Sequence, residues 1–300
     1  MPIELTEFRK SLCYTIQSPI ANIATDLQEL EKLDQLAENK QKEYGKKSLY
    51  YFLGAITSII LIFVLSITGI SDSLLGLIGI LLFLVIIGLI FASIYALIKR
   101  SKFKRLNLNN YRYQLVKNIL QMLSRDMDKT AVVDLQLSFQ PIDKKEHKTS
   151  EIPHPQKSGW KIDTYQHEWV KIKGQFLDKT RFELTATGIS KKQYGWKRGR
   201  SGKSKYKSKT KSGGLDINLS LIYPVNRYGA VKILQNEVSS AVKLPEFSQL
   251  RNLRVTDKAI QITARILPQV AENNQQIYQA IAGMFLSSYQ ILNLAKMLSK

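Results

Sequence analysis

The chain has 300 residues and a formal net charge of +20, with lysine and arginine far in excess of aspartate and glutamate. Cys13 is its only cysteine, which excludes an intrachain disulfide and is typical of a reducing compartment. The positive charge lies mostly after residue 98 and favours an anionic partner there.

Residues 1–48 are predicted to form amphipathic helices that lead toward a membrane. Apolar residues recur at helical spacing at Leu5, Phe8, Leu12 and Ile16. Ser18 followed by Pro19 is typical of a second helix start, with serine as the cap and proline at the first position. The apolar stripe then continues from Ile20 to Ala37.

Two apolar runs follow, Leu49 to Ile70 and Leu74 to Ile98, and only Ser71, Asp72 and Ser73 separate them. A helix that spans a bilayer needs about 20 apolar residues, so each run is long enough to cross. The short link predicts an antiparallel hairpin of two transmembrane helices over residues 49–98. Neither run contains an ionisable residue, which argues against an ion pump or coupled transporter.

Basic residues flank the hairpin on one side only. Lys46 and Lys47 precede the first run, Lys99 and Arg100 follow the second, and the link between the runs has no basic residue. Short flanks rich in lysine and arginine stay in the cytoplasm. We therefore expect an integral membrane protein with both termini in the cytoplasm, in a bacterial inner membrane or an equivalent internal membrane.

Residues 99–130 are predicted to form a helical stalk. Apolar and aromatic residues recur at helical spacing at Leu108, Tyr111, Leu115, Ile119 and Met122. A continuous helix from Lys99 to Asp128 would be about 45 Å long at 1.5 Å per residue. We expect it to pack antiparallel against the helices before the hairpin.

Residues 131–300 are predicted to form a cytoplasmic α+β domain. Apolar and polar residues alternate in five segments, which is typical of strands with one buried face. These segments are 133–139, 170–176, 182–186, 215–221 and 260–266. We expect a mostly antiparallel sheet of four to six strands, helices over Tyr228–Val242 and Gln275–Leu298, and a loop over Gln140–His167.

A basic β-ribbon is predicted over residues 189–214. Lys191 to Lys211 contains 10 basic residues and no acidic one, and lysine occupies every second position from Lys203 onward. Gly199, Ser201 and Gly202 indicate the turn. In an extended strand this spacing places five ammonium groups on one face. The residues assigned to an anionic partner are Trp196, Lys197, Arg198, Arg200, Lys203, Lys205, Tyr206, Lys207, Lys209 and Lys211.

Three interpretations of the ribbon remain open: a solvated insertion, a contact surface for phosphates of nucleic acid or lipid headgroups, and a contact with an acidic protein. No catalytic motif is recognisable, and no cofactor is expected. The chain's three histidines, His147, His154 and His167, match no metal-binding spacing and are expected at the surface.

These features favour a non-enzymatic scaffold or tether that is anchored in the lipid bilayer and binds an anionic surface through its ribbon. We expect it to self-associate as a homo-oligomer. The alternative is an oligomeric channel or pore-forming effector, in which the uncharged spans assemble in a ring and the cytoplasmic domain gates it.

Overall fold

The computed structural model describes residues 8, 10–67, 72–104, 106–232, 234 and 242–298. The chain divides into two units. The first comprises Met1–Leu27 together with Asn109–Lys300, and the second is Gln28–Leu108.

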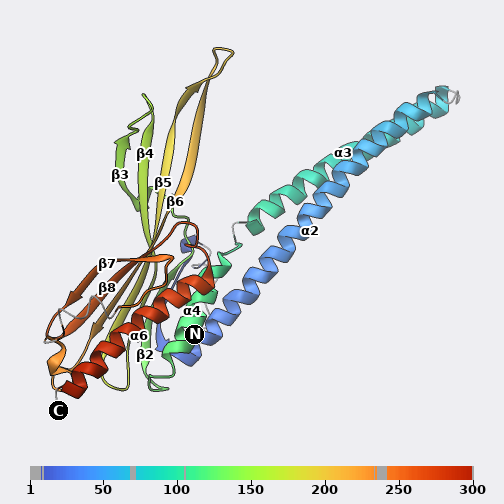
Figure 1. The fold of residues 1–300 in the computed structure, drawn as a ribbon. Helices are drawn as coiled ribbons and strands as arrows, with labels where there is room; N and C mark the ends of the chain where they lie inside the picture. Colours follow the sequence, from blue (N-terminus) through green and yellow to red (C-terminus); the bar gives the residue numbers. More distant parts are fainter. Residues whose placement is uncertain are drawn as a thin grey trace. The chain divides into compact units, whose positions relative to one another are not determined.

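The second unit is a pair of long antiparallel helices, α2 (Ile20–Ile67, which enters this unit at Gln28) and α3 (Asp72–Lys104) (Figure 1). The rings of Tyr44 and Phe103 stack with centroids 5.7 Å apart. Further along α2, the hydroxyls of Ser48 and Ser93 are 3.1 Å apart. The predicted pair of apolar helices is thus present, and the residues between them, 68–71, lie outside the described part.

The continuous stalk helix predicted from Lys99 to Asp128 is wrong. Helix α3 ends at Lys104, and a separate helix, α4, covers Asn110–Leu123. Between them the backbone N–H of Leu108 donates to the carboxylate of Asp34 at 2.7 Å, which is incompatible with an intrahelical bond at that position. Three asparagines lie at positions 107, 109 and 110, and asparagine favours helix ends over helix interiors.

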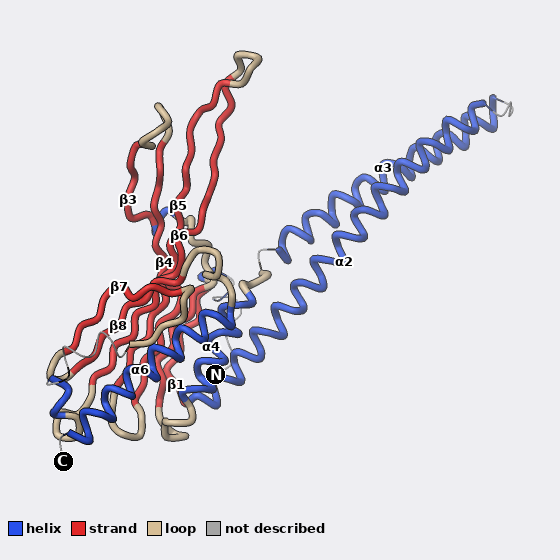
Figure 2. The backbone as a smooth tube through the Cα atoms, viewed as in Figure 1, coloured by secondary structure: helices blue, strands red, loops and turns tan. Residues whose placement is uncertain are grey.

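The first unit contains an eight-stranded antiparallel sheet in the order β1-β2-β4-β5-β6-β8-β7, with β3 paired to β4 (Figure 2). The strands are β1 Cys13–Pro19, β2 Val132–Ser138, β3 Lys148–Pro153, β4 Lys161–Gln175, β5 Arg181–Arg198, β6 Ser204–Ile222, β7 Ser248–Val255 and β8 Ala259–Ile266. The predicted antiparallel sheet is confirmed, but it has more strands than the four to six expected.

Alternation along the strands separates a buried face from a polar one. Ile217 and Leu219 of β6 and Ile262 of β8 are fully buried, on the face that α4 and the terminal helix α6 (Asn274–Leu298) cover. On the opposite face, Arg265 donates to Asp216 across the β6–β8 pair at 2.6 Å. The predicted C-terminal helix is confirmed as a core helix.

Three further expectations need correction. Ile16, predicted in a helix, lies in β1 opposite Leu135, because pairing with the sheet edge outweighs its helical spacing. The predicted loop over Gln140–His167 contains a short 3-10 helix, η1 (Lys145–His147), strand β3 and the start of β4. Of the helix predicted over Tyr228–Val242, the described residues at its start form a 3-10 turn, η2 (Gly229–Lys232), while 233 and 235–241 lie outside the described part.

Candidate functional site

The predicted basic ribbon is the outer part of the β5–β6 pair. These strands are hydrogen-bonded from Arg181–Ile222 to Arg198–Ser204. The pairing of β5 with β4 ends at Tyr194, so the ribbon is two-stranded beyond that residue (Figure 1). The Gly199 N–H donates to the Lys203 carbonyl at 2.9 Å, and beyond this bond a three-residue loop, 200–202, closes the ribbon. Gly202 lies in the left-handed region at φ +76°, and its N–H donates to the Gly199 carbonyl.

A β-bulge separates the ribbon from the body of the sheet. Gly214 pairs with Ile189 and Ser212 pairs with Ser190, so Gly213 is the extra residue on β6. Gly214 has φ +99°, and a Cβ there would lie 2.4 Å from the carbonyl oxygen of Ile266. Only glycine fits this close approach of β6 to the end of β8, and the bulge marks where the ribbon begins.

The register divides the ribbon into two chemically different faces. Lys197 lies directly opposite Lys205, and Lys191 lies opposite Lys211, so these lysines share one face with Lys207 and Lys209. Trp196 pairs with Tyr206, and Tyr194 with Ser208, on the other face. One face is therefore cationic and the other aromatic.

The ten predicted partner-binding residues consequently do not form a single surface. The cationic face holds Lys197, Lys205, Lys207, Lys209 and Lys211. Trp196, Arg198 and Tyr206 lie on the aromatic face, Arg200 is in the loop, and Lys203 precedes β6. Trp196 is 65% exposed and Tyr206 is 54% exposed, with their ring centroids 5.7 Å apart.

No acidic side chain neutralises the cationic face among the residues described. The ion pairs nearest in the fold lie on the neighbouring β3–β4 hairpin, where Lys148 contacts Asp163 at 2.9 Å and Lys161 contacts Glu151 at 2.6 Å. None of the ion pairs in the described ranges includes a basic residue of 191–211. Like charges directly opposite each other on a β-ladder are destabilising, so the facing lysine pairs lower the stability of the ribbon.

A tryptophan from outside the ribbon packs onto its cationic face. The ring of Trp160 lies against Gly195, where a Cβ would be 2.6 Å from the ring, and its indole N–H donates to the Trp196 carbonyl at 3.1 Å. The ammonium group of Lys157 is 4.6 Å from the Trp160 ring centroid. A hollow of about 560 Å³ is lined here by Lys157, Trp160, Gln193, Lys197, Lys207, Ser208 and Lys209.

Gly195 is the one sign of this hollow in the amino-acid sequence. Gly195 interrupts a strand of larger residues, and an interior glycine often marks the close approach of another group. Trp160 lies in the segment that was predicted as a loop, so no sequence pattern connects it with the ribbon. The tryptophan and Lys157 extend the candidate anion-binding surface beyond the ten residues named above.

Two histidines occupy a second candidate site at the junction of β2, β4 and η1. The rings of His147 and His167 stack with centroids 4.0 Å apart. His167, expected at the surface, is only 5% exposed, and its Nδ1 has no partner among the residues described. Burial, followed by the charge of His147, lowers the pKa of His167 to about 4, so its imidazole is neutral at neutral pH.

The described ranges contain no group of three or more His, Cys, Asp or Glu side chains that could hold a metal ion. Comparisons with protein-family models, with curated proteins and with solved structures give no match to this chain.

Proposed function

We propose that the protein is a membrane-anchored, non-enzymatic scaffold or tether that self-associates and recruits an anionic partner through its ribbon. Helices α2 and α3 would be the anchor, and the sheet unit would lie on the cytoplasmic side. The observation that carries the proposal is the unneutralised cationic face with its packed tryptophan.

Exposure of the apolar residues supports the anchor. Only 6% of the most apolar 18-residue stretch of α2 is buried, and only 17% of the corresponding stretch of α3. A helix in the core of a water-soluble protein would bury most of such a stretch. Phe63 and Phe91 are examples of large apolar side chains left exposed, and lipid would cover this surface favourably.

Order in the ribbon supports a contact role over a solvated insertion. A flexible insertion needs no fixed register, whereas here lysines face lysines at two rungs and glycines shape the bulge and the loop. An anionic surface against this face would relieve the repulsion between the lysines. Each basic residue near an anionic membrane is worth about 1 kcal/mol, and phosphates of nucleic acid attract lysine by the same electrostatic effect.

The test compares the protein with a charge-reversed variant in nanodiscs of neutral lipid. In this variant, glutamate replaces Lys203, Lys205, Lys207, Lys209 and Lys211. Binding is measured to vesicles containing anionic lipid, to single- and double-stranded oligonucleotides, and to polyglutamate, each at low and high salt. We expect the unmodified protein to bind at least one of these probes with a marked loss at high salt, and the variant to bind none.

A matched control distinguishes the effect of this surface on binding from the effect of net charge alone. Glutamate at Lys129, Lys145, Lys243, Arg251 and Lys258 changes the charge equally at exposed positions outside the ribbon. This control should weaken binding far less than the ribbon variant. Equal loss in both variants, or binding that is insensitive to salt and to the ribbon substitutions, would reject the proposal.

A further inference from the structure

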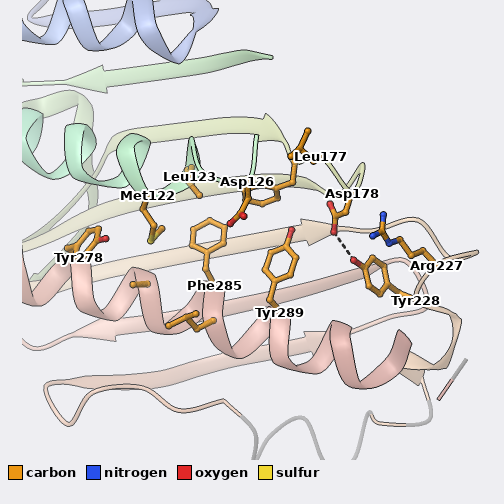
Figure 3. A pocket seen from close by; sticks show the side chains of 13 residues that line it. Met122, Leu123, Asp126, Leu177, Asp178, Arg227, Tyr228, Tyr278, Phe285 and Tyr289 are labelled. Carbon is orange, nitrogen blue, oxygen red and sulfur yellow. Dashed lines mark hydrogen bonds between the residues drawn. The ribbon is translucent and has the colours of Figure 1, made fainter. Parts of the chain in front are cut away.

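A cavity of about 610 Å³ lies between α4 and α6, and none of the ribbon residues lines it (Figure 3). The turn between β4 and β5 and the segment at Arg227 and Tyr228 complete its wall. Small-molecule sites typically have volumes of about 300–1,000 Å³ and a mostly apolar lining with a few polar groups. This cavity meets both criteria.

The body of the cavity is apolar. Met122 and Leu123 of α4 lie on one side and Phe285 of α6 on the other (Figure 3), and Ala282 and Leu286 of α6 also line the cavity. Phe285 is buried, whereas Leu286 is exposed, so the wall continues from the core to an open apolar edge. An apolar ligand of moderate length would cover this edge favourably.

Aromatic rings gather at one end. The Phe176 centroid is 5.6 Å from that of Tyr289 and 6.1 Å from that of Phe285, both in edge-to-face geometry. Tyr228 also lines the cavity, and its hydroxyl donates to Asp178 at 2.7 Å (Figure 3). Clusters of aromatic faces attract organic cations, including quaternary ammonium groups.

Two carboxylates lie at this aromatic end. Asp178 is largely occupied, since it accepts bonds from the Thr180 N–H and hydroxyl as well as from Tyr228. The carboxylate of Asp126 accepts no hydrogen bond from the described residues, and it lines the cavity. Burial and the charge of Asp178 raise the pKa of Tyr289, which keeps its hydroxyl protonated and uncharged.

The charges of the side chains that line the cavity favour a cationic ligand. Two carboxylates face the cavity against one guanidinium, that of Arg227, which lies 5.8 Å from the Tyr228 ring centroid. This local excess of negative charge stands in a chain whose net charge is +20. Asp126 is an exposed residue that lines the cavity, so its carboxylate would attract a cationic head group and repel an anionic one.

We propose that this cavity binds a small amphiphile with an organic ammonium head and an apolar body. The head lies among the rings of Phe176, Tyr228 and Tyr289 beside Asp126, and the body lies between α4 and α6 along Met122 and Leu286. This site is independent of the ribbon and of the scaffold function proposed above.

The experiment uses the full chain in neutral-lipid nanodiscs with ¹³C-methyl-labelled methionine. The probes are 4-phenylbutylamine, 4-phenylbutanol and 4-phenylbutyrate, which share one apolar body and differ in head charge. The methyl signal of Met122, assigned with Met122→Leu, reports on the cavity, and those of Met127 and Met297, which do not line it, are internal references. We expect a saturable shift of Met122 with the amine and affinity about tenfold weaker for the carboxylate.

Two substitutions test the assignment. Asp126→Asn should weaken the amine about tenfold and leave the alcohol unchanged. Ala282→Phe should fill the cavity and abolish all three shifts. Glu272→Gln, which removes an exposed acid that does not line the cavity, should change nothing. Equal affinity for the three heads, an amine affinity unaffected by Asp126→Asn, or no shift of Met122 would overturn the proposal, and the Asp126 test holds even where Ala282→Phe fails to fold.

Discussion

The burial of His167 determines its protonation state, and this makes the stability of the folded chain depend on pH. The folded state holds its pKa near 4, through burial first and then the positive charges of His147, Arg112 and Lys144. In the unfolded chain an ordinary histidine titrates near 6.5. Between these two values the unfolded state binds a proton that the folded state does not, so acidification in this range favours unfolding.

We therefore expect stability to fall as the pH is lowered from about 6.5 toward 4, by up to about 1.4 kcal/mol per pH unit from this one group. His167→Phe retains a ring against His147 and removes the titration, so its melting temperature should depend less on pH in that range. Thermal unfolding in detergent, followed at several pH values, measures this effect.

His154→Gln is the matched control, because His154 is only half-buried and shows no such stacking with another histidine. It should keep the pH dependence of the unmodified chain. An identical pH profile for His167→Phe would show that other groups cause the acid sensitivity.

At the scale of elements, the bulge on β6 connects backbone geometry to the ribbon. Gly214→Ala places a Cβ 2.4 Å from the Ile266 carbonyl oxygen, at a φ of +99°. A non-glycine residue in a sparsely populated backbone region costs about 1–3 kcal/mol before any clash is counted. We expect a lower melting temperature and a displaced ribbon, measured by thermal unfolding and by salt-dependent binding of the anionic probes.

Gly229→Ala provides the comparison, since a Cβ at Gly229 meets no atom within 4 Å and its φ is not positive. Its melting temperature should stay close to that of the unmodified chain. If both alanine variants melted alike, the bulge would not be a strained position.

Strands were predictable from sequence where one face is buried and the other is not. Leu215, Ile217 and Leu219 alternate with polar residues, and they lie in the buried C-terminal half of β6, where a strand was predicted. Strand β3 is exposed along its whole length, so it carries no alternating pattern to detect. In β7, Leu250 and Leu253 are three residues apart, which fits a helix better than a strand.

The two-faced ribbon shows why a site is harder to predict than its strands. The alternation of lysines placed Lys205, Lys207 and Lys209 on one face without further information. Which face Trp196 shares depends on the register across the turn, and that is fixed by the three-residue loop ending at Gly202. Trp160 reaches the ribbon from a segment with no periodic pattern, so only the tertiary structure reveals it.

At the scale of the whole molecule, the charge distribution argues for one topology across a membrane. Lys46 and Lys47 precede the apolar part of α2, and Lys99 and Arg100 follow that of α3, while residues 68–71 between the helices include no lysine or arginine. Lysine and arginine near the ends of a span favour the cytoplasmic side. Both termini and the ribbon are then expected in the cytoplasm.

Cys13 is the chain's only cysteine, so a Cys13→Ser background allows single reporter thiols to test this topology. Ser201→Cys at the exposed ribbon loop and Ser71→Cys between the helices are compared in sealed right-side-out and inside-out membrane vesicles, with a maleimide that cannot cross lipid. We expect the ribbon thiol to react in inside-out vesicles only, and the thiol at position 71 to react in right-side-out vesicles only. Reaction of the ribbon thiol in right-side-out vesicles would show that the orientation in the membrane is the reverse of the expected one. A chain that stayed monodisperse in water without detergent or lipid would contradict the anchor itself, because the apolar surfaces of α2 and α3 would then be sealed within a water-soluble assembly.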